Sequence, residues 1–70
     1  MITLQIERQL PGGSWTLHGD GQRFKDPVAA WQLVYEIMAW LPGTRLRLRA
    51  FRVDPYESTT KYLYPSARYA

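Results

Sequence analysis

The sequence predicts an α+β domain of the order β-β-α-β-β, with one helix packed on a four-stranded, mainly antiparallel sheet. Three observations indicate this fold. Apolar and polar residues alternate near both ends of the chain, turns rich in glycine and proline separate these stretches, and one longer apolar segment lies between them. Seventy residues suffice for one domain with one core. We expect this domain to span residues 1–64, with a C-terminal tail at 65–70.

The first quarter of the chain has the pattern of a β-hairpin. Apolar residues alternate with polar ones from Ile2 towards Leu10, which predicts a half-buried strand. Pro11-Gly12-Gly13 is typical of a turn, because proline presets φ and glycine tolerates positive φ. A second strand over 14–18 follows. Gly19-Asp20-Gly21 then bends the chain, after which residues 22–25 can resume extended pairing.

The central segment has the start and stop signals of a helix. Asp26 can accept hydrogen bonds from free amides at the N-cap, and Pro27 fits the first helical position. Pro42-Gly43 cannot continue a helix, so we expect the helix to end at about Leu41.

The apolar surface of this helix is wider than one small sheet can cover. Gln32 and Glu36 lie four residues apart on a polar stripe. The residues opposite that stripe should pack on the sheet: Ala30, Trp31, Val34, Met38 and Leu41. Leu33, Ile37 and Trp40 flank the buried stripe. Since a sheet covers roughly 100° of a helix, this flank is a candidate homodimer contact or second interface.

Arginine and apolar residues alternate with period two in a third predicted strand, Thr44 to Val53. Successive side chains of a strand point to opposite faces of its sheet. The buried face should therefore carry Leu46, Leu48 and Ala50, and the other face should carry Arg45, Arg47 and Arg49. Neighbouring arginines on that face lie roughly 6.6 Å apart and repel one another. The pattern predicts a basic sheet face suited to an acidic partner.

The alternation slips at Ala50-Phe51-Arg52. Strict period two would place Arg52 on the buried face, where an unpaired guanidinium is costly. We therefore expect a β-bulge near Ala50 that returns Phe51 and Val53 to the core.

A turn at 54–57 and a fourth strand over 58–64 complete the predicted sheet. In that strand Tyr62 and Tyr64 share one face, which is the arginine face if the fourth strand is in register with the third. Pairing of the first and fourth strands in the centre would give a β-grasp-like order. The sequence leaves other strand orders open.

The composition argues against catalysis and metal binding. The chain has no cysteine, which excludes disulfides, thiolate chemistry and cysteine-ligated zinc. Its one histidine, His18, lies in a predicted strand, and its acidic residues are scattered, so no nucleophile–base pair, metal-ligand spacing or paired carboxylate is visible. We expect that the protein is not an enzyme and needs no cofactor or metal.

The chain also lacks the sequence signals of a membrane protein. No apolar run reaches the ~18–20 residues that span a bilayer. The N-terminus lacks the pattern of a signal peptide. We expect no membrane partner and a cytoplasmic location.

The arginine face is the main functional signal. Seven of the nine basic residues are arginine, and the net charge is +3. Arginine, tyrosine and tryptophan are enriched where proteins bind one another. The candidate partner-binding residues are Arg45, Arg47, Arg49, Tyr62 and Tyr64. Two alternatives remain open. The face could bind nucleic acid, with arginines on phosphates and tyrosines stacked on bases, or it could be a solvated face that only keeps the protein soluble.

The chain resembles the small phage-encoded inhibitors of the anti-CRISPR kind. The resemblance rests on size, on the β-β-α-β-β order, and on Asp26-Pro27-Val28-Ala29-Ala30 followed by Met38-Ala39-Trp40 and a short turn. It covers the hairpin-to-helix stretch, about half the chain. It implies a compact, non-catalytic phage protein in the cytoplasm of a bacterial host, where it inhibits a host protein by occupying its surface. Such inhibitors often use acidic patches as nucleic-acid mimics. This basic chain departs from that pattern, and no family binding residue can be transferred to it.

Overall fold

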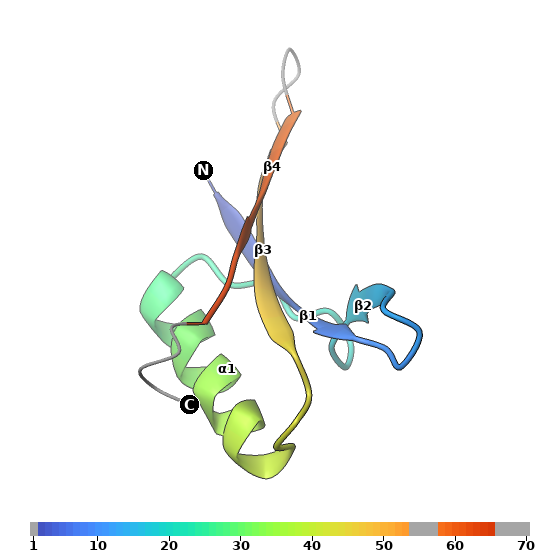
Figure 1. Cartoon of the computed structure of the whole chain (residues 1–70). Helices are drawn as coiled ribbons and strands as arrows, with labels where there is room; N and C mark the ends of the chain where they lie inside the picture. The colour runs from blue at the N-terminus through green and yellow to red at the C-terminus, as the bar shows by residue number, and fades with distance from the viewer. Residues whose placement is uncertain (1, 54–57, 66–70) are drawn as a thin grey trace.

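The expected α+β fold is present in the computed structural model, which describes residues 2–53 and 58–65 (Figure 1). The elements are β1 (Thr3–Gln9), β2 (Trp15–Leu17), α1 (Pro27–Trp40), β3 (Leu46–Val53) and β4 (Ser58–Leu63). The turn expected at 54–57 and residues 66–70 of the expected tail lie outside the described residues. Within the described part of the chain, no helix is long and apolar enough to cross a membrane.

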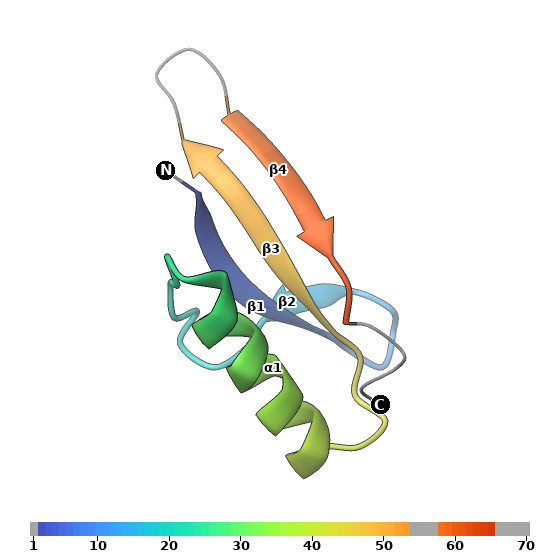
Figure 2. The same cartoon turned by 90° about the vertical axis from the view of Figure 1, so that its left-hand side faces the viewer.

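The sheet is antiparallel throughout, in the order β2-β1-β3-β4 (Figure 2). β1 and β3 pair in the centre, with Leu4 opposite Ala50 and Ile6 opposite Leu48. The central pairing of the first and fourth strands that would give a β-grasp-like order is therefore not formed. β3 carries fully buried leucines and needs neighbours on both sides, whereas the polar β4 can lie at the edge.

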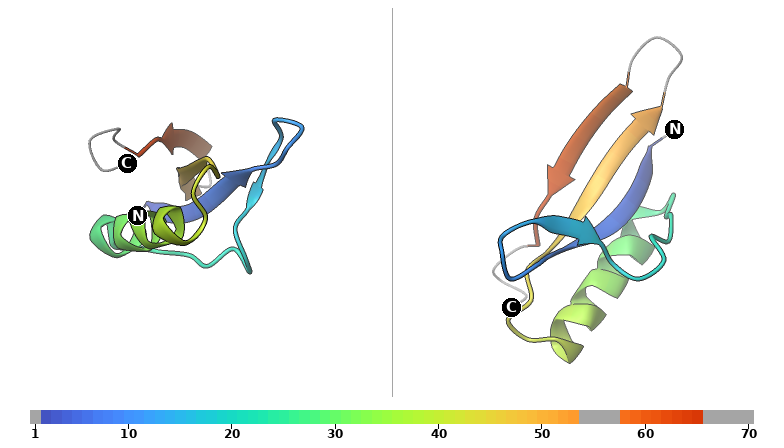
Figure 3. Two further views of the ribbon diagram at one scale, coloured as in Figure 1. Left: turned by 60° about the horizontal axis from the view of Figure 1, so that its bottom comes forward. Right: turned by 90° about the vertical axis from the view of Figure 1, so that its right-hand side faces the viewer.

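The core lies between α1 and the two central strands (Figure 3). Its buried apolar residues are Leu4, Ile6, Ala30, Val34, Ile37, Leu46 and Leu48. The predicted division of β3 into a buried leucine face and an arginine face is thus confirmed. Around this core lie the partly buried Phe24, Trp31, Leu33, Met38 and Ala50.

The helix is rotated relative to the sequence expectation. Ala30, Val34 and Ile37 are its buried residues, whereas Leu41, expected in the core, is 45% exposed. Ala30 is small and lets the helix approach the sheet closely. The larger Trp31 lies beside the contact instead of under it. Leu41 is the C-cap residue and has already left the helical path.

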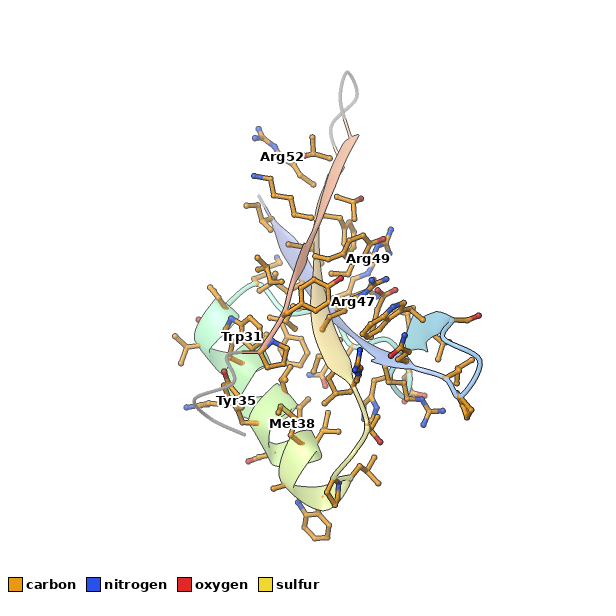
Figure 4. All side chains as sticks on the ribbon, viewed as in Figure 1. Trp31, Tyr35, Met38, Arg47, Arg49 and Arg52 are labelled. Carbon is orange, nitrogen blue, oxygen red and sulfur yellow. The ribbon has the colours of Figure 1, made fainter. Side chains whose placement is uncertain are left out.

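The expected β-bulge in β3 is absent. The register runs without a skip, pairing Ala50 with Lys61, Phe51 with Thr60 and Arg52 with Thr59. Phe51 therefore lies on the arginine face and does not return to the core. Arg52 points to the same side of the sheet as the buried leucines of β3, but it is exposed. Figure 4 shows the reason, because Arg52 lies beyond the end of α1, near the tip of the β3–β4 ribbon.

Two local features place the start of the helix where the sequence predicted it. The Oδ1 atom of Asp26 accepts a hydrogen bond from the backbone N–H of Val28 at 3.0 Å, and Pro27 occupies the first helical position. Replacing Asp26 by alanine removes this acceptor and should lower the free energy of unfolding by about 1 kcal/mol. Asp26→Asn keeps a capping oxygen and should cost much less. Urea unfolding of the two variants checks this, and equal losses would show that the cap is not the cause.

Candidate functional site

The face of the sheet that points away from α1, called the open face below, collects side chains from all four strands. Opposed residues of antiparallel strands share a face. The register places Glu7 opposite Arg47, Gln5 opposite Arg49, and Arg49 opposite Tyr62. The expectation that Tyr62 shares a face with the arginines is confirmed. The open face carries Gln5, Glu7, Trp15, Leu17, Arg47, Arg49, Phe51, Thr60 and Tyr62 in the strands, and Tyr64 just after β4.

Arg47 lies at the centre of an aromatic clamp formed by Trp15, Tyr62 and Tyr64. Its guanidinium carbon is 4.1 Å from the ring centroid of Trp15 and 3.8 Å from that of Tyr62. Its Nε donates a hydrogen bond to Oε1 of Glu7 at 2.8 Å, and Nη1 donates to the hydroxyl of Tyr64 at 3.4 Å. The rings of Trp15 and Tyr64 meet edge to face, with centroids 6.3 Å apart. One guanidinium therefore holds the three rings and a carboxylate together.

The charge of Arg47 is neutralised inside the protein. The side chains of Arg47 and Glu7 are each only 12% exposed. Burial alone would lower the pKa of Arg47, but its hydrogen bonds to Tyr64 and Glu7 outweigh that effect and raise the pKa above its ordinary value. Arg47 thus remains charged and paired, and its main role is to fix the rings around it.

Arg49 occupies a different environment one step along β3 (Figure 4). Its guanidinium lies 4.7 Å from the ring centroid of Phe51, and the guanidinium of Arg23 lies 5.9 Å from the same ring. Nη1 of Arg49 reaches Oε1 of the buried Gln5 at 3.5 Å, the long limit of a hydrogen bond. Gln5 is held in turn by donating Nε2 to the carbonyl of Gly21 at 2.8 Å. No carboxylate in the described ranges forms an ion pair with Arg49.

The remaining predicted binding residues lie at the accessible parts of the open face. Tyr62 is 44% exposed and Tyr64 is 61% exposed. Arg45 is exposed at the end of the arginine row, where it and Arg8 line an open depression of about 540 Å³. The structure thus brings Arg47, Tyr62 and Tyr64 into direct contact, with Arg49 beside them and Arg45 further along.

The predicted site residues did not include Gln5, Glu7, Trp15, Phe51 or Arg23. Period two places Glu7 and Trp15 on defined faces of their own strands. Their proximity to Arg47 depends on β3 pairing with β1, which the sequence left open. Phe51 was missed because the bulge was expected to bury it.

The predicted helix flank does not form one surface. Ile37 is 8% exposed and belongs to the core, and Leu33 is half-buried against it. Trp40 is 83% exposed. Of the three residues suggested as a dimer contact, only Trp40 is freely available to a partner.

The chain matches no protein-family model, no curated protein and no solved structure in the comparisons made with each. The geometry of the open face therefore carries the functional inference.

Proposed function

We propose that this protein is a small non-catalytic binding protein of the phage inhibitor type, which occupies a surface of a bacterial host protein with its open face. The observation that supports this is the aromatic clamp. Tyr62 and Tyr64 are exposed, yet their neighbour Arg47 holds them in place. Rings that are fixed before binding lose little conformational freedom on contact, which favours affinity.

The charges of the open face indicate an acidic partner surface. The negative charge of Glu7 is neutralised by its ion pair with Arg47. Arg23, Arg45 and Arg49 form no ion pair with a carboxylate among residues 2–53 and 58–65. Arg49 lies next to Arg47 along β3, Arg23 contacts the same Phe51 ring, and Arg45 lies at the end of the arginine row. These positive charges would attract carboxylates of a partner, setting orientation and association rate.

The same face fits protein better than nucleic acid. A backbone-binding face keeps its arginines free for phosphates. Here the arginine between the two tyrosines is already neutralised, and it occupies one face of the Tyr62 ring on which a base could stack. Binding to nucleic acid remains the alternative outcome of the test below.

Removing two of these charges should weaken partner capture. In an affinity capture from bacterial lysate treated with nuclease, the double variant Arg45→Ala with Arg49→Ala should bind its partner about tenfold or more weakly than the wild type. Neither side chain takes part in the core, so the variant should fold normally. The control is Arg52→Ala, compared with Arg49→Ala alone, because it removes one charge on the opposite side of β3.

Unchanged capture by the Arg45 and Arg49 double variant would exclude the open face as the binding site. Capture that disappears with nuclease, together with a gel shift that weakens steeply as salt rises, would assign the face to nucleic acid.

A further inference from the structure

Within the described residues, the outer edge of β4 presents backbone groups that have no hydrogen-bond partner, at known positions. The N–H of Gln9 in β1 donates to the carbonyl of Arg45 at 2.9 Å. In an antiparallel ladder the hydrogen-bonding side alternates at every residue. Odd-numbered residues of β3 therefore direct their backbone groups to β1, and even-numbered residues direct theirs to β4. Lys61 lies opposite Ala50, an even-numbered residue, so Lys61 bonds inward to β3.

By the same alternation Thr60 and Tyr62 direct their N–H and C=O groups away from β3. β4 is the last strand of the sheet, and no described strand pairs with its outer side (Figure 2). The opposite edge of the sheet is shorter. There β1 pairs with the three residues of β2, and beyond β2 it pairs only at the single bridge between Leu4 and Phe24. β4 is therefore the longer of the two edges that can accept another strand.

An apolar pocket lies on the helix side of the sheet beside this edge. It has a volume of about 270 Å³ and is lined by Ile2, Pro27, Ala50 and Leu63, together with Lys25 and Lys61. Ile2 is 57% exposed and Leu63 is 42% exposed. The pocket exists because α1 packs against β1 and β3 (Figure 3), so that this end of the sheet extends past the helix.

We propose that β4 receives an extended acidic segment of the partner as a fifth strand. This inference rests on the proposed function and specifies its mode of recognition. The outward N–H and C=O groups of Thr60 and Tyr62 supply main-chain hydrogen bonds. On the helix side, an apolar side chain of the segment enters the pocket and its carboxylates meet Lys25 and Lys61. On the other side, the segment contacts Tyr62, which makes the edge and the open face one continuous surface.

The charges favour a foreign acidic segment over a second copy of this chain. Two copies paired edge to edge would bring two molecules of net charge +3 together. The Lys61 side chains would then lie close to each other along the shared strand pair, where like charges are unfavourable. An acidic segment instead neutralises both lysines beside the pocket.

The test uses a fluorescent synthetic peptide of repeating Glu-Thr-Val-Thr, which places glutamate and valine on the same face of an extended strand, and a matched peptide with lysine in place of glutamate. Fluorescence anisotropy should show that the full chain binds the acidic peptide about tenfold or more tightly than the basic one. Thr60→Pro removes an outward N–H that the sheet does not use, so the fold should survive. This variant should lose binding of the acidic peptide about tenfold or more, while Thr60→Val, which keeps the N–H, should bind as the wild type does.

Each contrary result overturns the proposal in a recognisable way. Equal binding of both peptides, no binding of the acidic peptide, or equal binding by Thr60→Pro and Thr60→Val would exclude the edge as the recognition site. A wild-type dimer that becomes monomeric in Thr60→Pro, measured by light scattering, would assign the edge to a second copy. If Thr60→Pro captures the host protein from lysate as well as the wild type does, this inference fails while the proposed function stands. If the wild type captures no host protein, the proposed function fails, and the peptide comparison still decides the inference.

Discussion

Replacing Leu48 by alanine is expected to remove most of the stability of this protein. Leu48 is fully buried in the central strand, opposite Ile6 and beneath α1. Truncation of a buried leucine costs about 2–5 kcal/mol, because the apolar contacts are lost and a cavity remains. Small domains have total stabilities of about 5–15 kcal/mol, and a chain of this length lies towards the lower end of that range.

Urea unfolding followed by circular dichroism measures this effect. Leu10→Ala is the matched control, since Leu10 is 40% exposed and its truncation should change stability by about 0.5 kcal/mol or less. A Leu48→Ala protein as stable as the wild type would contradict the assignment of the two faces of β3. Both the core and the open face depend on that assignment.

Replacing Arg47 by alanine should give the second largest loss, although its side chain lies outside the core formed with α1. The substitution leaves the carboxylate of Glu7, which is 12% exposed, without its partner at 2.8 Å. It also removes the guanidinium that lies against the rings of Trp15 and Tyr62. A poorly solvated group that loses its hydrogen bond costs about 1–3 kcal/mol, and each cation–π contact adds about 0.5–1 kcal/mol.

Two further variants separate these contributions. Arg47→Lys keeps the charge but loses the planar group that contacts both rings, so it should recover only part of the stability. A double-mutant cycle of Arg47→Ala with Glu7→Gln should give a coupling energy of about 1 kcal/mol. Because the pKa of Arg47 is raised, its stabilising charge is fully present at every pH below its ordinary pKa and is lost only as the pH rises through the folded-state pKa. Additive single effects would show that the ion pair contributes nothing.

The sequence was sufficient for features that depend on local rules. Asp26-Pro27 and Pro42-Gly43 predicted the limits of the helix, and α1 spans Pro27–Trp40. Period two predicted which face of β3 is buried, because a strand permits only two faces. The same rule placed Tyr62 on the arginine face if the fourth strand is in register with the third, and both that register and the contact of Tyr62 with Arg47 are observed.

The sequence was insufficient where tertiary placement decides. The apolar arc of α1 is wide enough for several rotations, and the close approach at Ala30 selected the one that buries Ile37 and exposes Leu41. The bulge was expected because Arg52 was assumed to face the helix. The helix does not reach that end of β3, so Arg52 can point to the helix side of the sheet and still remain exposed. The partner of Arg47, Glu7, required knowledge of the strand order.

The clamp around Arg47 uses the same side chains to stabilise the fold and to bind a partner. Trp15 and Tyr62 help to hold the sheet together, so a change there that alters partner choice also weakens the molecule. Arg23 and Arg45 lie outside the clamp and carry little of that burden. Substitutions that change the binding target should therefore occur first at these outer positions, where they cost little stability. Substitutions of the central rings should follow only after stabilising changes elsewhere in the protein.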